Sequence, residues 1–208
     1  MTDGQFSAIP VHMSGTGVTE RADAARNRRL LLAAAKTLID TRGAAAVTMD
    51  AVAAEAGVGK GTVFRRFGSR TGLMHALLDH SESELQQAYI SGPMPLGPGA
   101  PPLDRLLAFG RARLKLTADH LDVLVEAGAD SGEFLNHPVW RAYTQHVQIL
   151  LRQLGFSNNI EAVSIAIQAP LGAAAVANLT TVVGMDIVTI GDQWEQMVRT
   201  LVAGLTLA

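Results

Sequence analysis

The 208-residue sequence contains no cysteine, and aromatic residues make up only 5% of it. The absence of cysteine excludes disulfide scaffolds, zinc–thiolate fingers, iron–sulfur clusters and cysteine nucleophiles. No strand-like alternation of apolar and polar residues occurs, and no internal repeat is evident. Hydrophobic residues nevertheless reach 48%, which is typical of a globular chain and excludes a disordered or collagen-like one.

Charge is also scarce, at 17% of residues with a formal net charge of −2, but it is unevenly distributed. Residues 20–80 hold ten Lys or Arg against six Asp or Glu, whereas residues 81–208 hold seven against twelve. A basic module followed by an acidic one is typical of a protein that contacts phosphate groups with one part only.

The first twenty residues are rich in Gly, Ser, Thr and Pro, without helical periodicity, and they hold no Lys or Arg. We expect a disordered tail over 1–20. A signal peptide would need basic residues before an apolar run, so we expect a cytoplasmic protein.

From about residue 21, apolar residues recur at helical spacing and predict a helix that ends near Gly43. Thr48 is the expected N-cap of a short helix, TMDAVAAEA, which ends at Gly57. A second short helix, GKGTVFRRF, follows and ends at Gly68, with Ser69 as the next N-cap. Two short helices on either side of a turn that contains Gly predict a helix-turn-helix.

The rest of the sequence predicts further helices and one loop. A helix from Ser69 to about residue 90 is followed by a loop rich in Gly and Pro. The later helices are expected at about 103–118, 120–128, 137–154, 158–183 and 192–206.

The stretch from Arg28 to Leu78 resembles the DNA-binding domain of TetR-family transcriptional regulators. The family pattern there is close to T-x-x-x-I-A-x-x-A-G-V-S-K-G-T-L-Y-x-H-F-x-S-K-x-x-L. The residues in register with it are Thr48, Val52, Ala53, Ala56, Gly57, Val58, Lys60, Gly61, Thr62, Phe67, Ser69 and Leu73. The resemblance implies an all-α protein with a helix-turn-helix DNA-binding domain at 21–68 and a larger helical domain at 69–208 for ligand binding and dimerisation. Residues 69–90 would form the connecting helix.

The second short helix has the pattern of a recognition helix. Val58, Val63 and Phe67 are expected to face the core, which leaves a polar face made of Lys60, Thr62, Arg65 and Arg66. The resemblance implies phosphate contacts from Thr48, Lys60, Phe64 and Arg70, and base contacts around Gly61, Thr62 and Arg65.

Three positions depart from the family pattern. Phe64 replaces Tyr and loses a hydroxyl, Gly59 replaces Ser and loses a capping group, and Arg66 replaces His and adds a charge. We expect these changes to alter the operator sequence and the salt dependence of binding without abolishing it.

Residues 162–185 carry no charge. By length they could span a membrane, but polar residues and Pro170 interrupt them and basic flanking clusters are absent. We therefore predict a buried helix that Pro170 bends. The family resemblance implies that residues 160–206 form a homodimer interface, with an apolar stripe on the last helix made of Trp194, Met197, Leu201, Val202 and Leu205.

Several aromatic and polar residues of the larger domain have the types that line ligand pockets. They are Phe109, Arg113, Phe134, Trp140, Tyr143, His146 and Gln168. For any one of them we favour a place in the core over a ligand contact, because Trp140, Tyr143 and Val147 also share a helical stripe with Leu150 and Leu154. The family resemblance implies a small-molecule effector of unspecified chemistry.

No pattern in the sequence indicates catalysis. The six histidines show no metal-binding spacing, and no P-loop or nucleophile elbow occurs. We expect no enzyme activity, cofactor or metal. The expected function is a ligand-responsive repressor that binds a palindromic operator in double-stranded DNA as a dimer. The alternative is a helical small-molecule-binding or membrane-associated protein without functional DNA binding.

Overall fold

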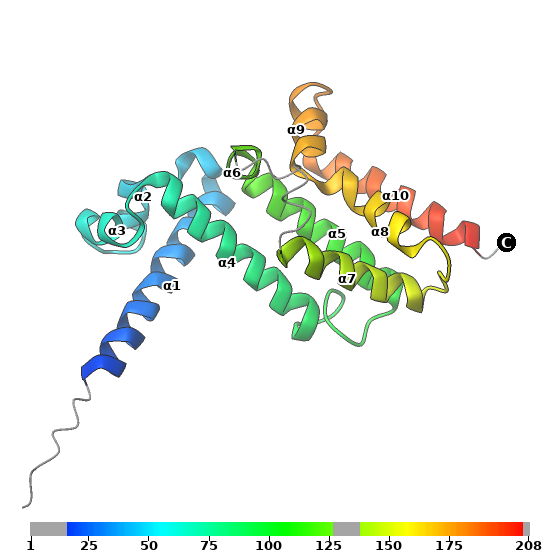
Figure 1. Ribbon diagram of the computed structural model, residues 1–208. Coiled ribbons are helices and arrows are strands. Elements are labelled where there is room, and N and C mark those ends of the chain that lie inside the picture. The colour runs from blue at the N-terminus through cyan, green and yellow to red at the C-terminus, as the bar shows by residue number, and fades with distance from the viewer. Residues whose placement is uncertain (1–15, 127–137, 206–208) are drawn as a thin grey trace, which may run out of the picture.

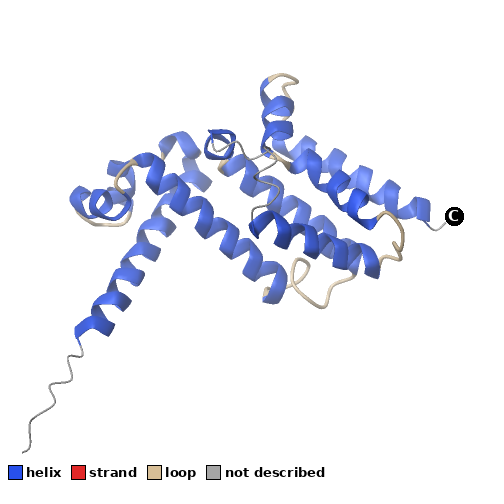
Figure 2. Cartoon of the chain, viewed as in Figure 1, coloured by secondary structure: helices blue, strands red, loops and turns tan. Residues whose placement is uncertain are grey.

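The computed structural model describes residues 16–126 and 138–205. Within these ranges the chain forms helices and loops and contains no strand (Figure 2). The expected all-α fold is therefore confirmed. A small module formed by the first three α-helices lies at one end of the molecule, and the remaining helices form a larger module (Figure 1).

The small module is a helix-turn-helix preceded by a long helix. Its elements are α1 (Thr16–Arg42), a 3-10 turn η1 (Ala44–Ala46), α2 (Met49–Glu55) and α3 (Lys60–Phe67). Helix α2 packs against both α1 and α3. The start of α1 differs from the prediction, because residues 16–20, expected to belong to the tail, are helical. Residues 1–15 of the predicted tail lie outside the described residues.

The turns of this module form as the sequence predicts. Thr48 caps α2, because its Oγ1 accepts a hydrogen bond from the Ala51 amide at 3.1 Å. The turn after α2 has Gly57 at φ 65°. The amides of Gly57 and Val58 donate to the carbonyls of Ala54 and Ala53 at 3.2 and 3.0 Å. This is the hydrogen-bond pattern of a Schellman motif, which favours Gly at that position.

The larger module contains seven α-helices among the described residues. They are α4 (Arg70–Ser91), α5 (Pro102–Asp119), α6 (Leu121–Glu126), α7 (Pro138–Gln153), α8 (Ile160–Gln168), α9 (Ala173–Thr181) and α10 (Ile187–Leu205). Helix α5 is central, because α4, α7 and α10 all pack against it.

The single helix predicted over 158–183 is wrong. It is broken into α8, a 3-10 turn η3 (Ala169–Leu171) and α9, and the two parts meet at 41°. Pro170 lies in this turn, so the expected bend is present but ends α8 instead of curving it. Among the described residues, no single helix is long and apolar enough to cross a membrane, and this bent pair passes by length and composition alone.

The last helix starts at Ile187, five residues earlier than predicted. Its Trp194 is buried at 3% exposure, and the indole Nε1 donates a hydrogen bond to the Ile167 carbonyl at 2.7 Å. Trp194 was predicted to lie in the apolar stripe of a dimer interface, but within one chain its side chain is buried against α8 and against Gly110 of α5. Met197 is exposed and Leu201 half-buried, whereas the side chain of Leu205 lies outside the described part of the chain.

Helix α4 connects the two modules (Figure 1). Its first turn lies beside the helix-turn-helix, where Ser69 Oγ accepts from the Gly72 amide at 3.1 Å. Further along, it packs against α1 and α5. A polar contact joins the modules directly, because Lys115 Nζ of α5 lies 2.9 Å from Asp40 Oδ1 of α1. A displacement of α4 or α5 would therefore also shift the helix-turn-helix.

Candidate functional site

Helix α3 has one buried and one exposed face. Val63 is completely buried, and Val58 and Phe67 are half-buried against the core. Lys60, Arg65 and Arg66 are exposed and Thr62 is half-buried. The structure thus has the division between core and polar faces that the sequence predicts, and the polar face is available to a partner.

Two of the three cations of this face already have partners within the protein. Lys60 Nζ lies 2.7 Å from Asp50 Oδ1 of α2, with both side chains well exposed. The Arg66 guanidinium donates to the Ala24 carbonyl of α1. Arg65 has no hydrogen bond or ion pair within the described residues. Its guanidinium is therefore the cation of this helix that can bind a group outside the chain without first breaking a contact within the described residues.

Arg70 occupies a different kind of position. Its Nε donates to the Val47 carbonyl at 2.8 Å and its Nη2 to the Ala44 carbonyl at 3.1 Å. These carbonyls belong to the turn before α2, so Arg70 ties α4 to the helix-turn-helix. Contact with a phosphate stays a prediction for Arg70, and the structure adds this positioning role.

The start of α3 lacks side chains that would obstruct a close partner. Gly59 is the N-cap and makes no side-chain capping bond. A Cβ atom built at Gly59 or Gly61 would meet nothing within 4 Å. Packing within the chain therefore does not require either glycine, whereas close approach to a phosphate chain would favour both. Phe64 is 42% exposed, and the Lys60 ammonium lies 5.8 Å from its ring centroid.

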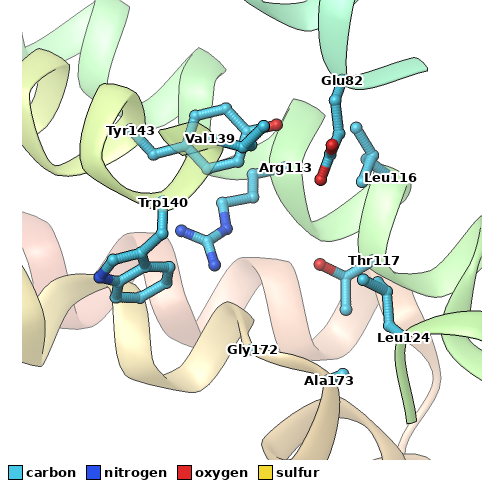
Figure 3. Close-up of a pocket in the computed structure, with 10 residues that line it drawn as sticks. All are labelled: Glu82, Arg113, Leu116, Thr117, Leu124, Val139, Trp140, Tyr143, Gly172 and Ala173. Atoms are coloured by element: carbon cyan, nitrogen blue, oxygen red, sulfur yellow. The ribbon is translucent and has the colours of Figure 1, made fainter. Parts of the chain in front are cut away.

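The larger module encloses a small space, which we name the inner cavity (Figure 3). Its volume is about 20 Å³, close to the smallest volume that holds a water molecule. Three of the predicted pocket residues line it, namely Arg113, Trp140 and Tyr143. The other lining residues are Glu82, Leu116, Thr117, Leu124, Val139, Gly172 and Ala173.

Arg113 is the cation of the inner cavity. Its guanidinium carbon lies 4.6 Å from the Trp140 ring centroid and 5.1 Å from that of Tyr143. Its Nη1 donates to Gln168 Oε1 at 2.8 Å. Gln168 is fully buried and is not among the residues that line the cavity. This predicted pocket residue instead orients the Arg113 side chain through that hydrogen bond.

Two other predicted pocket residues lie in an aromatic cluster beside the cavity. Phe109 is 1% exposed and packs edge-on against Tyr89 and Tyr143, with ring centroids 5.5 Å apart in each pair. His146 stacks on Tyr89 at 4.2 Å. Phe109 is therefore a core residue, whereas His146 reaches the groove described next. Phe134 lies outside the described residues.

A more open hollow, which we name the outer groove, lies between α4 and α7. Its inner part has a volume of about 180 Å³ and shares Glu82, Val139 and Tyr143 with the inner cavity. Its outer part, about 310 Å³, is lined in part by Tyr89, Arg105 and His146. The inner cavity and the outer groove therefore adjoin each other at Glu82.

Sequence reasoning did not identify Glu82. It lies on α4 between Leu78 and Leu85, an acidic residue within an otherwise apolar stripe, and that interruption was the available signal. Burial, with the nearby Asp79 carboxylate as a smaller cause, raises the pKa of Glu82 from 4.5 to about 7, against the opposing effect of Arg113.

Burial also changes the titration of three neighbours. It lowers the pKa of His146 to about 4 and that of His120 to about 4, so both are neutral near pH 7. It raises the pKa of Tyr143 well above the usual range. Among the described residues, no group of three or more His, Asp or Glu is placed to hold a metal ion.

The fold and these sites define the class. The chain is a helix-turn-helix protein that carries a separate helical module with an internal cavity. Residues 31–77 match the model of the family described as bacterial regulatory proteins, tetR family. The match covers the helix-turn-helix domain, where the sequence pattern also resembles this family.

Solved structures extend the likeness in fold to most of the chain. A transcriptional regulator from Saccharomonospora viridis, in complex with choline, has a TM-score of 0.60 at 16% identity, covering 84% of this chain and 96% of that one. A TetR-family regulator from Pectobacterium atrosepticum has a TM-score of 0.58 at 21% identity, covering 89% and 96%. No protein of curated function matches the sequence. At these identities the structures show a shared fold.

Proposed function

We propose that this protein is a transcriptional repressor that binds a palindromic DNA operator as a homodimer and is released by a small-molecule effector. The observation that carries the proposal is the exposed polar face of α3. Lys60, Thr62 and Arg65 project from a helix that Val63 anchors in the core. A helix entering the major groove needs such a row of donors. We propose repression by exclusion of RNA polymerase, because repression is the commonest behaviour in the family that the chain resembles.

The homodimer is proposed through residues 160–206. Apolar side chains are exposed on this part of the surface, with Ile165 of α8 at 53%, Val188 of α10 at 66% and Met197 of α10 at 37%. Exposed apolar patches mark interaction surfaces more often than isolated residues do. Two recognition helices are also needed to read half-sites about 34 Å apart, which one copy of the chain cannot supply.

The effector is proposed to bind at the inner cavity and the outer groove. Support comes from the buried charged groups there and from the choline bound to the Saccharomonospora viridis protein of similar fold. An effector weakens DNA binding only to the extent that it prefers a conformation with displaced recognition helices, and DNA then weakens effector binding by the same factor. The protein would act in the cytoplasm.

A gel-shift titration of the purified chain on the DNA upstream of its own gene tests the proposal. We expect a discrete complex whose affinity exceeds that for unrelated DNA by about 10³-fold or more and falls steeply as salt increases. Equally weak, salt-insensitive binding to all sequences would instead support a ligand-binding or membrane-associated protein without DNA function.

A further inference from the structure

The Glu82 side chain is largely buried and lies on the walls of both the inner cavity and the outer groove. The residue is only 9% exposed, and its side chain makes no hydrogen bond or ion pair within the described part of the chain. Figure 3 shows the carboxyl group directed into the inner cavity from α4. A largely buried carboxylate without a hydrogen bond from the chain is weakly stabilised, so a hydrogen-bond donor that enters the cavity would stabilise it.

Two oxygen atoms, those of Tyr143 and Thr117, lie on the wall of the same inner cavity as Glu82. The Tyr143 hydroxyl is buried and has no hydrogen-bond partner among the described residues. Thr117 donates its hydroxyl proton to the Leu171 carbonyl at 2.9 Å, so its Oγ1 has only lone pairs left to offer. A hydrogen-bond donor would suit the Glu82 carboxylate and the Thr117 lone pairs, and the Tyr143 hydroxyl oxygen is able to accept from the same donor.

The charges around the site favour a cation. Asp79 lines the outer groove one turn before Glu82, so a ligand that arrives through the groove passes two carboxyl groups. Arg113 faces Glu82 from α5, but its guanidinium stacks on Trp140 and Tyr143 and donates to Gln168. An anionic group at Glu82 would meet both carboxylates at close range.

The remaining lining of the site is apolar. Leu116, Leu124 and Val139 line the inner cavity, and Val139 and Ala142 continue along the α7 side of the groove. The cavity itself holds about 20 Å³ and the adjoining part of the groove about 180 Å³. These volumes fit a small polar head at Glu82 with an apolar body in the groove.

We propose that the effector of this protein is an organic ammonium ion with an apolar body, whose N–H groups donate to the Glu82 carboxylate and to the Tyr143 hydroxyl oxygen. This proposal rests on the proposed function, since it names the chemical class of the effector. It concerns ligand binding alone and can be measured without DNA.

Calorimetric titration of the full chain with three probes of equal length tests the proposal. The probes are hexylammonium, hexanol and hexanoate, at about pH 8, above the pKa of Glu82 in the folded chain. We expect hexylammonium to bind at least about 10-fold more tightly than hexanol, because hydrogen bonds to charged groups are the stronger ones. Equal binding of the ammonium ion and the alcohol, or tighter binding of hexanoate, would overturn the proposal.

Variants locate the binding group. Glu82→Gln should reduce the affinity for hexylammonium by about 10-fold and leave that for hexanol unchanged. Tyr143→Phe keeps the ring and should cause a smaller loss, about 3-fold. Glu161→Gln, a matched change on the exposed surface of α8, should have no effect. Unchanged hexylammonium affinity in a folded Glu82→Gln chain would contradict the assignment.

Proton release gives a second signature. At about pH 6 most Glu82 side chains of the free chain are protonated, and a bound cation would ionise them. Tyr143 and His146 on α7 stay neutral there, and Arg113 on α5 stays charged. We therefore expect release of about one proton per ligand at that pH and none at about pH 8. Absence of proton release at the lower pH would contradict contact with Glu82.

The two proposals fail in different measurements. A chain that binds its upstream DNA but shows no preference for hexylammonium would refute only the effector class. A chain that prefers hexylammonium but does not bind DNA specifically would refute the regulator function and retain the ammonium site.

Discussion

At the scale of single residues, Glu82 is an acidic side chain in a largely buried environment that raises its pKa. Sequence spacing locates Thr48 and Ser69 as helix caps correctly, because capping depends on neighbours three residues away. It could not locate Glu82, because burial of an acid depends on which helices pack against α4. Local rules thus predicted the turns of the DNA-binding domain but not the buried charge of the larger one.

Glu82→Gln should remove part of the pH dependence of stability. In the folded chain the pKa of Glu82 is raised from 4.5 to about 7. Between these values the unfolded chain has lost the proton that the folded chain keeps, so stability falls as pH rises through this range. Above about pH 7, the free energy of unfolding should be lower by on the order of 3 kcal/mol than it would be with a Glu82 of ordinary pKa.

Urea denaturation at several pH values measures this effect. The difference in unfolding free energy between Glu82→Gln and the wild type should grow in favour of the variant from about pH 4.5 to 7 and then stay constant. His120 and His146 titrate in the opposite direction in both proteins, so the difference cancels their contribution. A difference that does not change with pH would show that Glu82 ionises normally.

Lys60 and Arg65 should differ in their effects on DNA binding. Lys60→Ala should weaken binding to all sequences similarly and reduce the dependence on salt, as expected for a phosphate contact. Arg65→Ala should cost about 1–3 kcal/mol on the operator and relax its sequence preference. Competition gel shifts with single base-pair substitutions measure both, and indistinguishable profiles would refute this division of roles.

At the scale of elements, the sequence predicted most helices but not how the region around Pro170 is arranged. Pro170 was expected to bend a helix, whereas α8 ends there and α9 starts in a new direction. Trp194 likewise shares a stripe with exposed residues in the sequence, but Gly110 of α5 leaves the space in which its ring is buried. Periodicity gives the faces of a helix, and the partner helix decides which face is covered.

Gly110→Ala should disrupt the packing of α10 on α5. A Cβ at this position would overlap the Trp194 ring, so the ring or the helix must move. We expect destabilisation of about 1–3 kcal/mol, as is usual for overpacking, despite the better helix propensity of Ala. Gly204→Ala is the control, because its Cβ meets nothing within 4 Å. Urea denaturation measures both, and equal stabilities would contradict this close contact.

At the scale of the whole molecule, one copy of the chain offers one helix-turn-helix, and apolar side chains are exposed on α8 and α10. The resemblance in sequence covers only the helix-turn-helix, whereas the likeness in fold extends over most of the chain. The family pattern could therefore predict the DNA-binding domain in detail. The residues that line the inner cavity and the outer groove lie outside the matched stretch, so the pattern did not predict them.

Ile165→Glu should prevent dimerisation. Ile165 is 53% exposed on α8, and a charge there would be buried without a partner in the proposed interface. Ile90→Glu is a matched control, since Ile90 is 55% exposed on α4, away from that interface. Light scattering at micromolar concentration should give a monomer for the first variant and a dimer for the wild type and the control. A monomeric wild-type chain would contradict the interface.

Fluorescence anisotropy of a labelled duplex from the upstream region, titrated with the full chain at increasing salt, tests the central claim most directly. The account predicts saturation at two chains per operator, an affinity that falls steeply as salt rises, and release by an unlabelled operator at much lower concentrations than by unrelated DNA. Saturation at one chain per operator, or equal competition by unrelated DNA, would contradict it.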